Sequence, residues 1–105
     1  MAIVIWTRQA TNNIRAIHDY KKLDSAFHAK QLVNQLVKQT DTQLSALPNS
    51  GRRVEEFENS IFSHLRQLSY KGYRIIYEFS DEQDIVTVIT VVHSRQQLTP
   101  EMIDK

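Results

Sequence analysis

The stretch SYKGYRIIYEFSD, residues 69–81, decides the predicted fold. Apolar and aromatic side chains stand at its odd positions from Tyr73 to Phe79, which is the period-two pattern of a β-strand with one buried face. The even positions instead hold Arg74, Ile76 and Glu78. We therefore expect the odd set to pack on helices. Arg74 should lie on the opposite face, which a small antiparallel sheet can leave open to solvent.

Two further strands are predicted on either side of this one, over residues 65–69 and 85–92. The links between the three strands, YKG and SDEQD, are short and polar, so consecutive strands should pair antiparallel. With Phe79 opposite Ile85, Arg74 would lie on one face of the sheet while His93 and Arg95 point to the other. A slip of one residue, or a β-bulge late in the last strand, would bring these groups together. The sequence leaves both registers open.

The chain before these strands predicts a strand and two helices. Residues 3–6 are β-branched and aromatic, as in a strand, and residues 9–21 show helical apolar spacing. Asp24 or Ser25 is suited to cap a second helix, whose apolar stripe runs from Phe27 to Leu47. Two helices with so short a link should form an antiparallel hairpin.

The order of elements is therefore β-α-α-β-β-β. Helices gathered in one part of the chain and strands in another predict an α+β fold, an antiparallel sheet of four strands packed on the helical hairpin. Residues 53–60 are polar and are expected to be irregular, and Pro100 opens a short tail. Residues 1–105 are expected to form a single domain, since neither a linker nor a repeat interrupts them.

Composition limits the chemistry of the site. The chain has 13 basic and 12 acidic residues, a net charge of +1, so any site for a polyanion must be a local patch. It has no cysteine, and its four histidines lack ligand spacing, so we expect no metal and no cofactor. The N-terminal apolar run is too short for a signal peptide or a membrane span. A cytoplasmic location without a membrane partner is the simple expectation.

Four segments together resemble a known family. They are the spaced apolar residues of the first helix, LPNSGRRVEEF (47–57), LRQLSYKGYRIIYE (65–78) and ITVVHSRQQL (89–98). In order and spacing they are similar to the RelE/ParE superfamily of toxins from type II toxin–antitoxin systems, with the ParE branch the closer one. ParE-like chains typically show a Gly-Arg turn and a VxHxRR-like ending. Gln96 stands here in place of the last arginine of that ending.

The resemblance implies partners and a choice of target. A cognate antitoxin would wrap the toxin and lay an apolar stripe in a groove beside the helical hairpin. ParE-like members poison DNA gyrase, whereas RelE-like members cut mRNA in the ribosomal A site without a metal. An inactive relative that is retained only to bind the antitoxin is a third possibility. The oligomeric state is left open.

The candidate site residues follow from these alternatives. For the nuclease, Arg74 matches the strand arginine that contacts the RNA phosphate, with His93 and Arg66 as further candidates. For target binding without catalysis, the candidates are Arg74, Arg95, His93 and Arg52. Arg74 could equally be a structural cation paired with Glu78, a neighbouring strand or the chain terminus.

Three departures from the nuclease branch favour the ParE-like prediction. The central region carries acids, Glu55, Glu56 and Glu58, which are expected to form a solvated face. The C-terminal tail has no tyrosine. A ribosome-directed nuclease should also carry an excess of lysine and arginine, which this chain lacks. We therefore expect a toxin that inhibits gyrase, with the mRNA endonuclease as the alternative.

Overall fold

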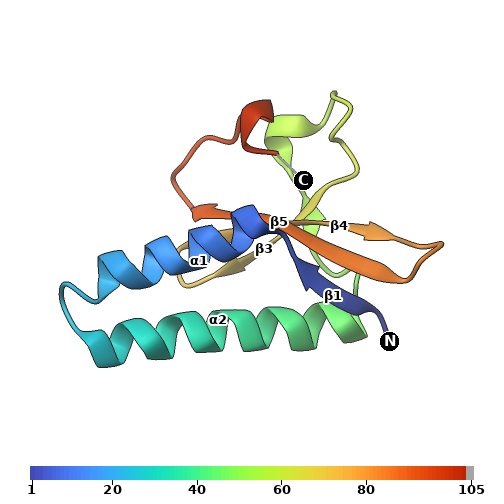
Figure 1. Ribbon diagram of the computed structural model, residues 1–105. Helices are drawn as coiled ribbons and strands as arrows, with labels where there is room; N and C mark the ends of the chain where they lie inside the picture. The colour runs from blue at the N-terminus through green and yellow to red at the C-terminus, as the bar shows by residue number, and fades with distance from the viewer. Residues whose placement is uncertain (104–105) are drawn as a thin grey trace.

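Two helices cover one face of a five-stranded sheet in the computed structural model, which describes residues 1–103 (Figure 1). The strand order across the sheet is β1-β5-β4-β3-β2. The helices and strands are β1 (Ile3–Trp6), α1 (Arg8–Lys21), α2 (Ala26–Ala46), β2 (Arg52–Arg53), β3 (Arg66–Tyr70), β4 (Tyr73–Ser80) and β5 (Ile85–His93). Short 3-10 turns lie at η1 (Glu55–Phe57) and η2 (Pro100–Met102).

The α+β fold and the helical hairpin are as predicted, and so is the antiparallel pairing of β3, β4 and β5. Two features of the sheet were not predicted. β1 pairs parallel to β5 at one edge, and β2 adds a fifth strand at the other. The two residues of β2 lie in a segment that is polar throughout, so no apolar alternation marks them as a strand.

Local signals position the two helices. The side chains of Thr7 and Ser25 accept hydrogen bonds from backbone N–H groups of the first turns of α1 and α2, as N-caps do. The buried stripe of α2 consists of Ala29, Val33, Leu36, Thr40 and Leu44. Phe27, expected on this stripe, is instead 72% exposed. Two residues before Ala29 correspond to about 200° of helix rotation, which turns Phe27 away from the sheet.

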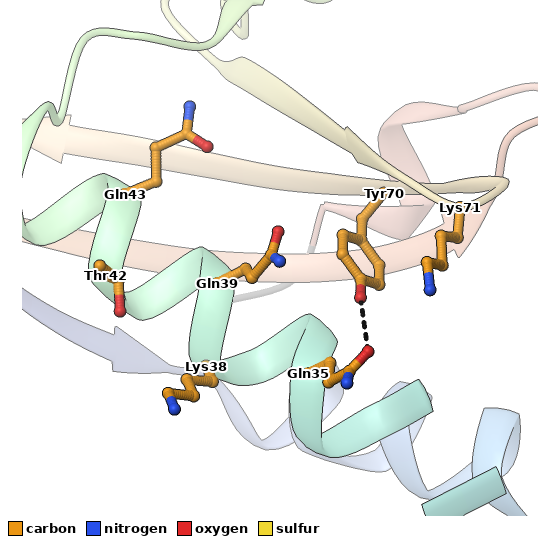
Figure 2. Close-up of a pocket in the computed structure, with 7 residues that line it drawn as sticks. All are labelled: Gln35, Lys38, Gln39, Thr42, Gln43, Tyr70 and Lys71. Carbon is orange, nitrogen blue, oxygen red and sulfur yellow. Dashed lines mark hydrogen bonds between the residues drawn. The ribbon is translucent and has the colours of Figure 1, made fainter. Parts of the chain in front are cut away.

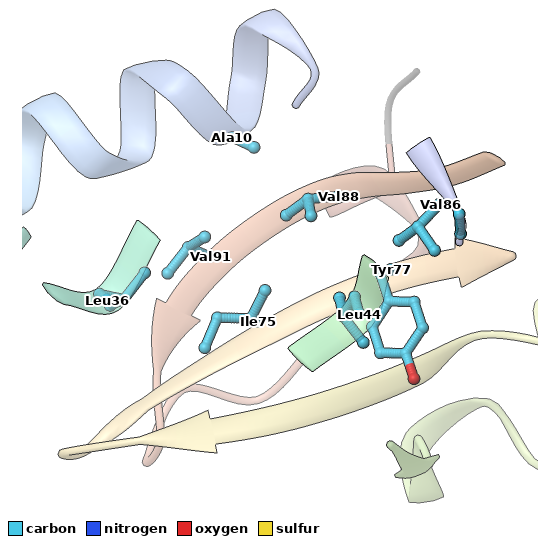
Figure 3. Close-up of a cluster of buried hydrophobic side chains, with 9 residues drawn as sticks. Ala10, Leu36, Leu44, Ile75, Tyr77, Val86, Val88 and Val91 are labelled. Carbon is cyan, nitrogen blue, oxygen red and sulfur yellow. The ribbon is translucent and has the colours of Figure 1, made fainter. Parts of the chain in front are cut away.

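The main core lies between the helices and the sheet (Figure 3). Ile75 and Tyr77 of β4 are fully buried there, and Tyr73 and Phe79 pack against the same cluster, so the predicted odd-numbered face is confirmed. The fully or nearly fully buried members are Ala2, Ala10, Leu36, Leu44, Ile75, Tyr77, Val86, Val88 and Val91.

The opposite face of the sheet is partly covered, and the prediction that it is open was wrong. Ile76 of β4 is fully buried in a second apolar cluster. Figure 1 shows the segment after β2 and the C-terminal segment lying together over this face. The cluster consists of Val54, Phe57, Leu65, Ile76, Ile89, Val92 and Leu98. Apolar residues dispersed through two irregular segments give no periodic signal, so this cover was not visible in the sequence.

A β-bulge sets the register of β4 against β5. Ile76 pairs with Thr90 and Tyr77 with Val88, which leaves Ile89 as the extra residue of β5. Arg74 consequently lies opposite Val92 rather than Thr90. Such a bulge was one of the alternatives considered, but it lies three residues earlier than expected and does not bring Arg74 and His93 together.

Candidate functional site

Arg74 is held in an ion pair with Glu56. Its two terminal nitrogens donate hydrogen bonds of 2.7 and 2.8 Å to the two carboxylate oxygens, the bidentate arrangement that suits a guanidinium. Its Nε donates to Oε1 of Gln67 at 2.7 Å. The side chains of Arg74 and Glu56 are only 12% and 13% exposed. The guanidinium charge is therefore balanced within the chain.

The same carboxylate ties down the C-terminal segment. Glu56 also accepts a hydrogen bond of 3.1 Å from the backbone N–H of Leu98, and Arg74 donates to the carbonyl of Gln96 at 3.4 Å. The hydrogen bonds from Arg74, which outweigh burial, lower the pKa of Glu56 from 4.5 to about 2, with a further contribution from the Leu98 N–H. Three segments far apart in the sequence thus meet at one ionised carboxylate.

The solvated acidic face predicted for the central region is therefore only partly correct. Glu55 and Glu58 are exposed as expected, but Glu56 turns inward to Arg74. Glu56 turns inward because the segment that covers the second sheet face brings η1 over β4. Arg74 is thus a paired cation, with Glu56 rather than Glu78 as its partner. Glu78 instead accepts a hydrogen bond of 3.1 Å from Nε2 of His64.

The other nuclease candidates lie on the helix-covered face. Arg66 pairs with Tyr77 and donates to the carbonyl of Gly51 at 2.7 Å. His93 pairs with Tyr73, and their rings meet edge to face at 5.8 Å. Opposite residues of an antiparallel pair share a face, so both side chains lie on the face away from Arg74. The structure does not bring the three together.

The two remaining candidates are exposed cations. Arg52, in β2, lines a cleft of about 440 Å³ at whose base the Arg74–Glu56 pair lies. Arg95 follows β5 in a turn that is closed by a hydrogen bond from its own N–H to Nδ1 of His93, 3.1 Å long. Both guanidinium groups are exposed to a partner molecule. Arg52 precedes the covering segment that follows β2, whereas Arg95 precedes the C-terminal covering segment.

A larger groove lies beside the helical hairpin, between α2 and the β3–β4 turn (Figure 2), and the residues that line it were not predicted. Its volume is about 830 Å³, and it is lined by Gln35, Lys38, Gln39, Thr42, Gln43, Tyr70 and Lys71. The Tyr70 hydroxyl donates to Gln35 at 3.3 Å, and the Lys71 ammonium lies 5.6 Å from the centre of the Tyr70 ring. The run of glutamines and lysines along one face of α2 was the signal that could have pointed to it.

The lining of this groove combines apolar surface with polar and cationic groups. Lys71 and Gly72 both have positive φ, as the two central residues of a tight hairpin turn require, and this turn fixes Lys71 at the rim. Amides, hydroxyls and two ammonium groups line the groove, and no carboxylate does. The groove is therefore suited to a segment that brings hydrogen-bond acceptors and negative charge together with apolar side chains.

Among residues 1–103, no group of three or more histidine, cysteine or acidic side chains is placed to hold a metal ion. Over the same described part of the chain, no helix is long and apolar enough to cross a lipid bilayer.

A match to a known family identifies the class of protein to which this chain belongs. Residues 4–98 match the family model described as the ParE toxin of the type II toxin–antitoxin system parDE. The chain belongs to the ParE toxin family, within the RelE/ParE superfamily. It is thus a toxin of the type II toxin–antitoxin class. A search of curated proteins found no match.

Solved structures share the fold of this ParE-family toxin at low sequence identity. A chain of the chromosomal ParDE system from P. aeruginosa is 21% identical with a TM-score of 0.70, over 89% of this chain and 96% of that one. A chain of the RelBE2 toxin–antitoxin complex from Mycobacterium tuberculosis is 17% identical with a TM-score of 0.66, over 88% and 90%. A chain of the intact E. coli RelBE toxin–antitoxin complex is 19% identical with a TM-score of 0.53, over 91% of this chain and 100% of that one.

Proposed function

We propose that this toxin acts by binding DNA gyrase rather than by cleaving RNA, and that its antitoxin neutralises it. The observation that carries the proposal is the ion pair of Arg74 with Glu56. A phosphate clamp needs a guanidinium whose donors are free, but all of the hydrogen bonds that Arg74 directs into the cleft end on protein oxygens.

The separation of the other groups supports the same proposal. Metal-free RNA cleavage needs a base, an acid and a cation around one phosphate. His93 and Arg66 lie on the sheet face opposite Arg74, and His93 stacks against Tyr73. Together with the net charge of +1, this arrangement favours a protein-binding toxin over a nuclease.

Arg52, Arg95 and His93 are our candidates for target contact. All three are exposed, and they lie around the ends of the segments that cover the second sheet face. In this proposal Arg74 has an indirect role, since with Glu56 it holds the backbone of Gln96 and Leu98 in place. The C-terminal segment is thereby kept in one shape for its partner.

We infer that the groove between α2 and the β3–β4 turn receives part of the antitoxin. The two lysines and the amide groups of its lining would pair with carboxylates and backbone carbonyls of an extended or helical segment. The Tyr70 ring offers the apolar surface within the groove, so a mixed acidic and apolar segment is the expected ligand.

Controlled expression in a bacterium tests this function. Gyrase poisoning predicts filamentation and a DNA-damage response while translation is initially intact, with growth restored when the antitoxin is co-expressed. Rapid translation arrest with cleaved mRNA would instead identify a RelE-like endonuclease. Normal growth at high expression would identify an inactive relative that only binds the antitoxin. Either result would reject the proposal.

A further inference from the structure

The two edges of the sheet are built differently. β2, at one edge, is two residues long, and both are arginines. β1, at the other edge, has the sequence IVIW, and its Ile3 and Ile5 side chains are 63% and 47% exposed. Proteins usually protect a sheet edge with charged side chains or a very short strand, because an edge can pair with another chain. β2 has both protections, and β1 lacks charge entirely.

The outer side of β1 has hydrogen-bonding groups to offer. The N–H groups of Ile3 and Thr7 donate to the carbonyls of Asp84 and Val88, at 3.0 Å each, on the β5 side. Successive residues of a strand direct their backbone groups to opposite sides, so Val4 and Trp6 direct theirs outward. Within the described residues no strand pairs with that side.

The open length of this edge is limited by α2. The N–H of Ala2 donates to the carbonyl of Ser45 at 2.9 Å, which closes the edge at the start of β1. The indole N–H of Trp6 donates to Asp41 at 2.8 Å, which fixes that side chain against α2. Between these two anchors a groove of about 430 Å³ separates β1 from α2. The free edge is therefore short and rigidly placed, and Ile5 lies at its centre.

We propose that β1 pairs antiparallel with β1 of a second copy of this chain, around a two-fold axis at Ile5. Val4 of each copy then lies opposite Trp6 of the other, so that every outward N–H of the two residues meets an outward carbonyl. Ile5 meets Ile5 on the exposed face, and Ile3 lies opposite Thr7 of the second copy. The edge strand is self-complementary in both its backbone and its apolar side chains.

The charges at the two ends of β1 favour this direction and this occupant. Asp84, exposed in the β4–β5 turn, lies beside the start of β1, whereas Arg8, also exposed, follows its end. Antiparallel pairing places Arg8 of each copy opposite Ala2 of the other, with the acidic β4–β5 turn one strand further in. It also directs Arg8 towards the C-terminus of α2, whose last turn has no basic residue of its own. Parallel pairing would bring like charges together.

The dimer should be weak, because so short a strand pair buries little surface. Sedimentation equilibrium of the full chain, made by cell-free translation, should give a mass that rises with concentration from 12.3 kDa towards twice that value. Ile5→Lys should abolish the rise. Ile61→Lys, at a side chain that is 84% exposed and remote from β1 in the sequence, should leave it unchanged.

A cross-link tests the position of the axis. Opposite residues of a non-hydrogen-bonded antiparallel pair have Cα atoms about 4.5 Å apart, within disulfide range. The chain has no cysteine, so under mild oxidation Ile5→Cys should form a covalent dimer and Ile61→Cys should not. A monomeric wild-type chain at all concentrations, or equal cross-linking of both variants, would overturn the proposal. The proposal would also be overturned if the wild-type chain is monomeric and Ile5→Lys weakens antitoxin binding alone.

Discussion

Arg74 and Glu56, 18 residues apart in the chain, hold each other through two hydrogen bonds in a cleft lined by polar side chains. The guanidinium of Arg74, which could otherwise contact a polyanion, is thereby used in an internal ion pair that stabilises the fold. The pair joins β4 to η1 and, through Leu98, to the C-terminal segment. The consequences for stability and for function can be measured separately.

Replacing Glu56 with Gln should make the toxin less stable in a way that depends on pH. The pKa of Glu56 is lowered from 4.5 to about 2, so the ionised carboxylate stabilises the fold above pH 4.5 and this contribution disappears as the pH falls towards 2. A shift of that size corresponds to at most about 3–4 kcal/mol of unfolding free energy at pH 7. Urea unfolding of wild type and variant between pH 7 and pH 2 measures the difference.

We expect the difference in unfolding free energy between wild type and Glu56→Gln to be largest near pH 7 and to shrink below pH 4.5. Glu58→Gln, at an exposed carboxylate in the same segment, is the matched control and should change the unfolding free energy by less than about 0.5 kcal/mol. A gap that stays constant down to pH 2 would mean that the charge of Glu56 is not the source of its contribution.

Gly51→Ala should destabilise the fold strongly although it adds one carbon. A Cβ at Gly51 would lie 2.6 Å from the hydroxyl of Tyr77 and 2.7 Å from the carbonyl of Gln67. The N–H of Gly51 also donates to that hydroxyl at 2.9 Å, so the backbone cannot withdraw without losing a buried hydrogen bond. We expect a loss of roughly 2–4 kcal/mol in thermal or urea unfolding.

Gly72→Ala is the comparison for Gly51. A Cβ at Gly72 meets nothing within 4 Å, but its φ of +88° strains any other residue, so the loss should be about 1 kcal/mol. If both variants lose the same amount, close approach to Tyr77 is not what requires glycine at position 51.

Lys38→Glu should weaken binding of the antitoxin. The change places a carboxylate in a groove whose lining is amide and ammonium, and we expect a loss of about tenfold or more in affinity by calorimetry at low salt. Lys30→Glu makes the same change of charge on the same helix outside the groove lining, and should leave the affinity within about twofold of wild type. Equal losses in both variants would indicate a general charge effect.

Arg95→Ala and Arg52→Ala should reduce toxicity without unfolding the protein. Both side chains are exposed, so each substitution should alter the unfolding free energy by less than about 0.5 kcal/mol. If they contact the target, the concentration needed to inhibit gyrase supercoiling should rise by about tenfold. Inhibition at the wild-type concentration would remove these residues from the target surface.

Periodic elements of the fold were predictable, and irregular ones were not. The alternation from Tyr73 to Phe79 identified the buried face of β4, and Ser25 identified the start of α2. β2 and the cover formed by residues 54–65 and 98–103 lack any period, because each apolar residue in them is placed by a different turn. Tertiary packing alone decides such segments.

The candidate site was less predictable because it depends on that cover. The sequence presents Arg74 as a cation on a strand, but only the position of Glu56 in three dimensions shows that the charge is already satisfied. A bulge at Ile89 likewise determines which residue of β5 faces Arg74, and no residue type signals a bulge there. The family could thus be predicted from the sequence, whereas the role of Arg74 depends on contacts between distant segments.

The central claim is that this toxin binds gyrase and does not cut RNA. Its most direct test uses one purified preparation of the full chain in two reactions, supercoiling by gyrase and translation by programmed ribosomes, with mRNA ends mapped by primer extension. We expect inhibited supercoiling, relieved by antitoxin, and intact mRNA. Cleavage of mRNA in the ribosomal A site, with supercoiling unaffected, would contradict it.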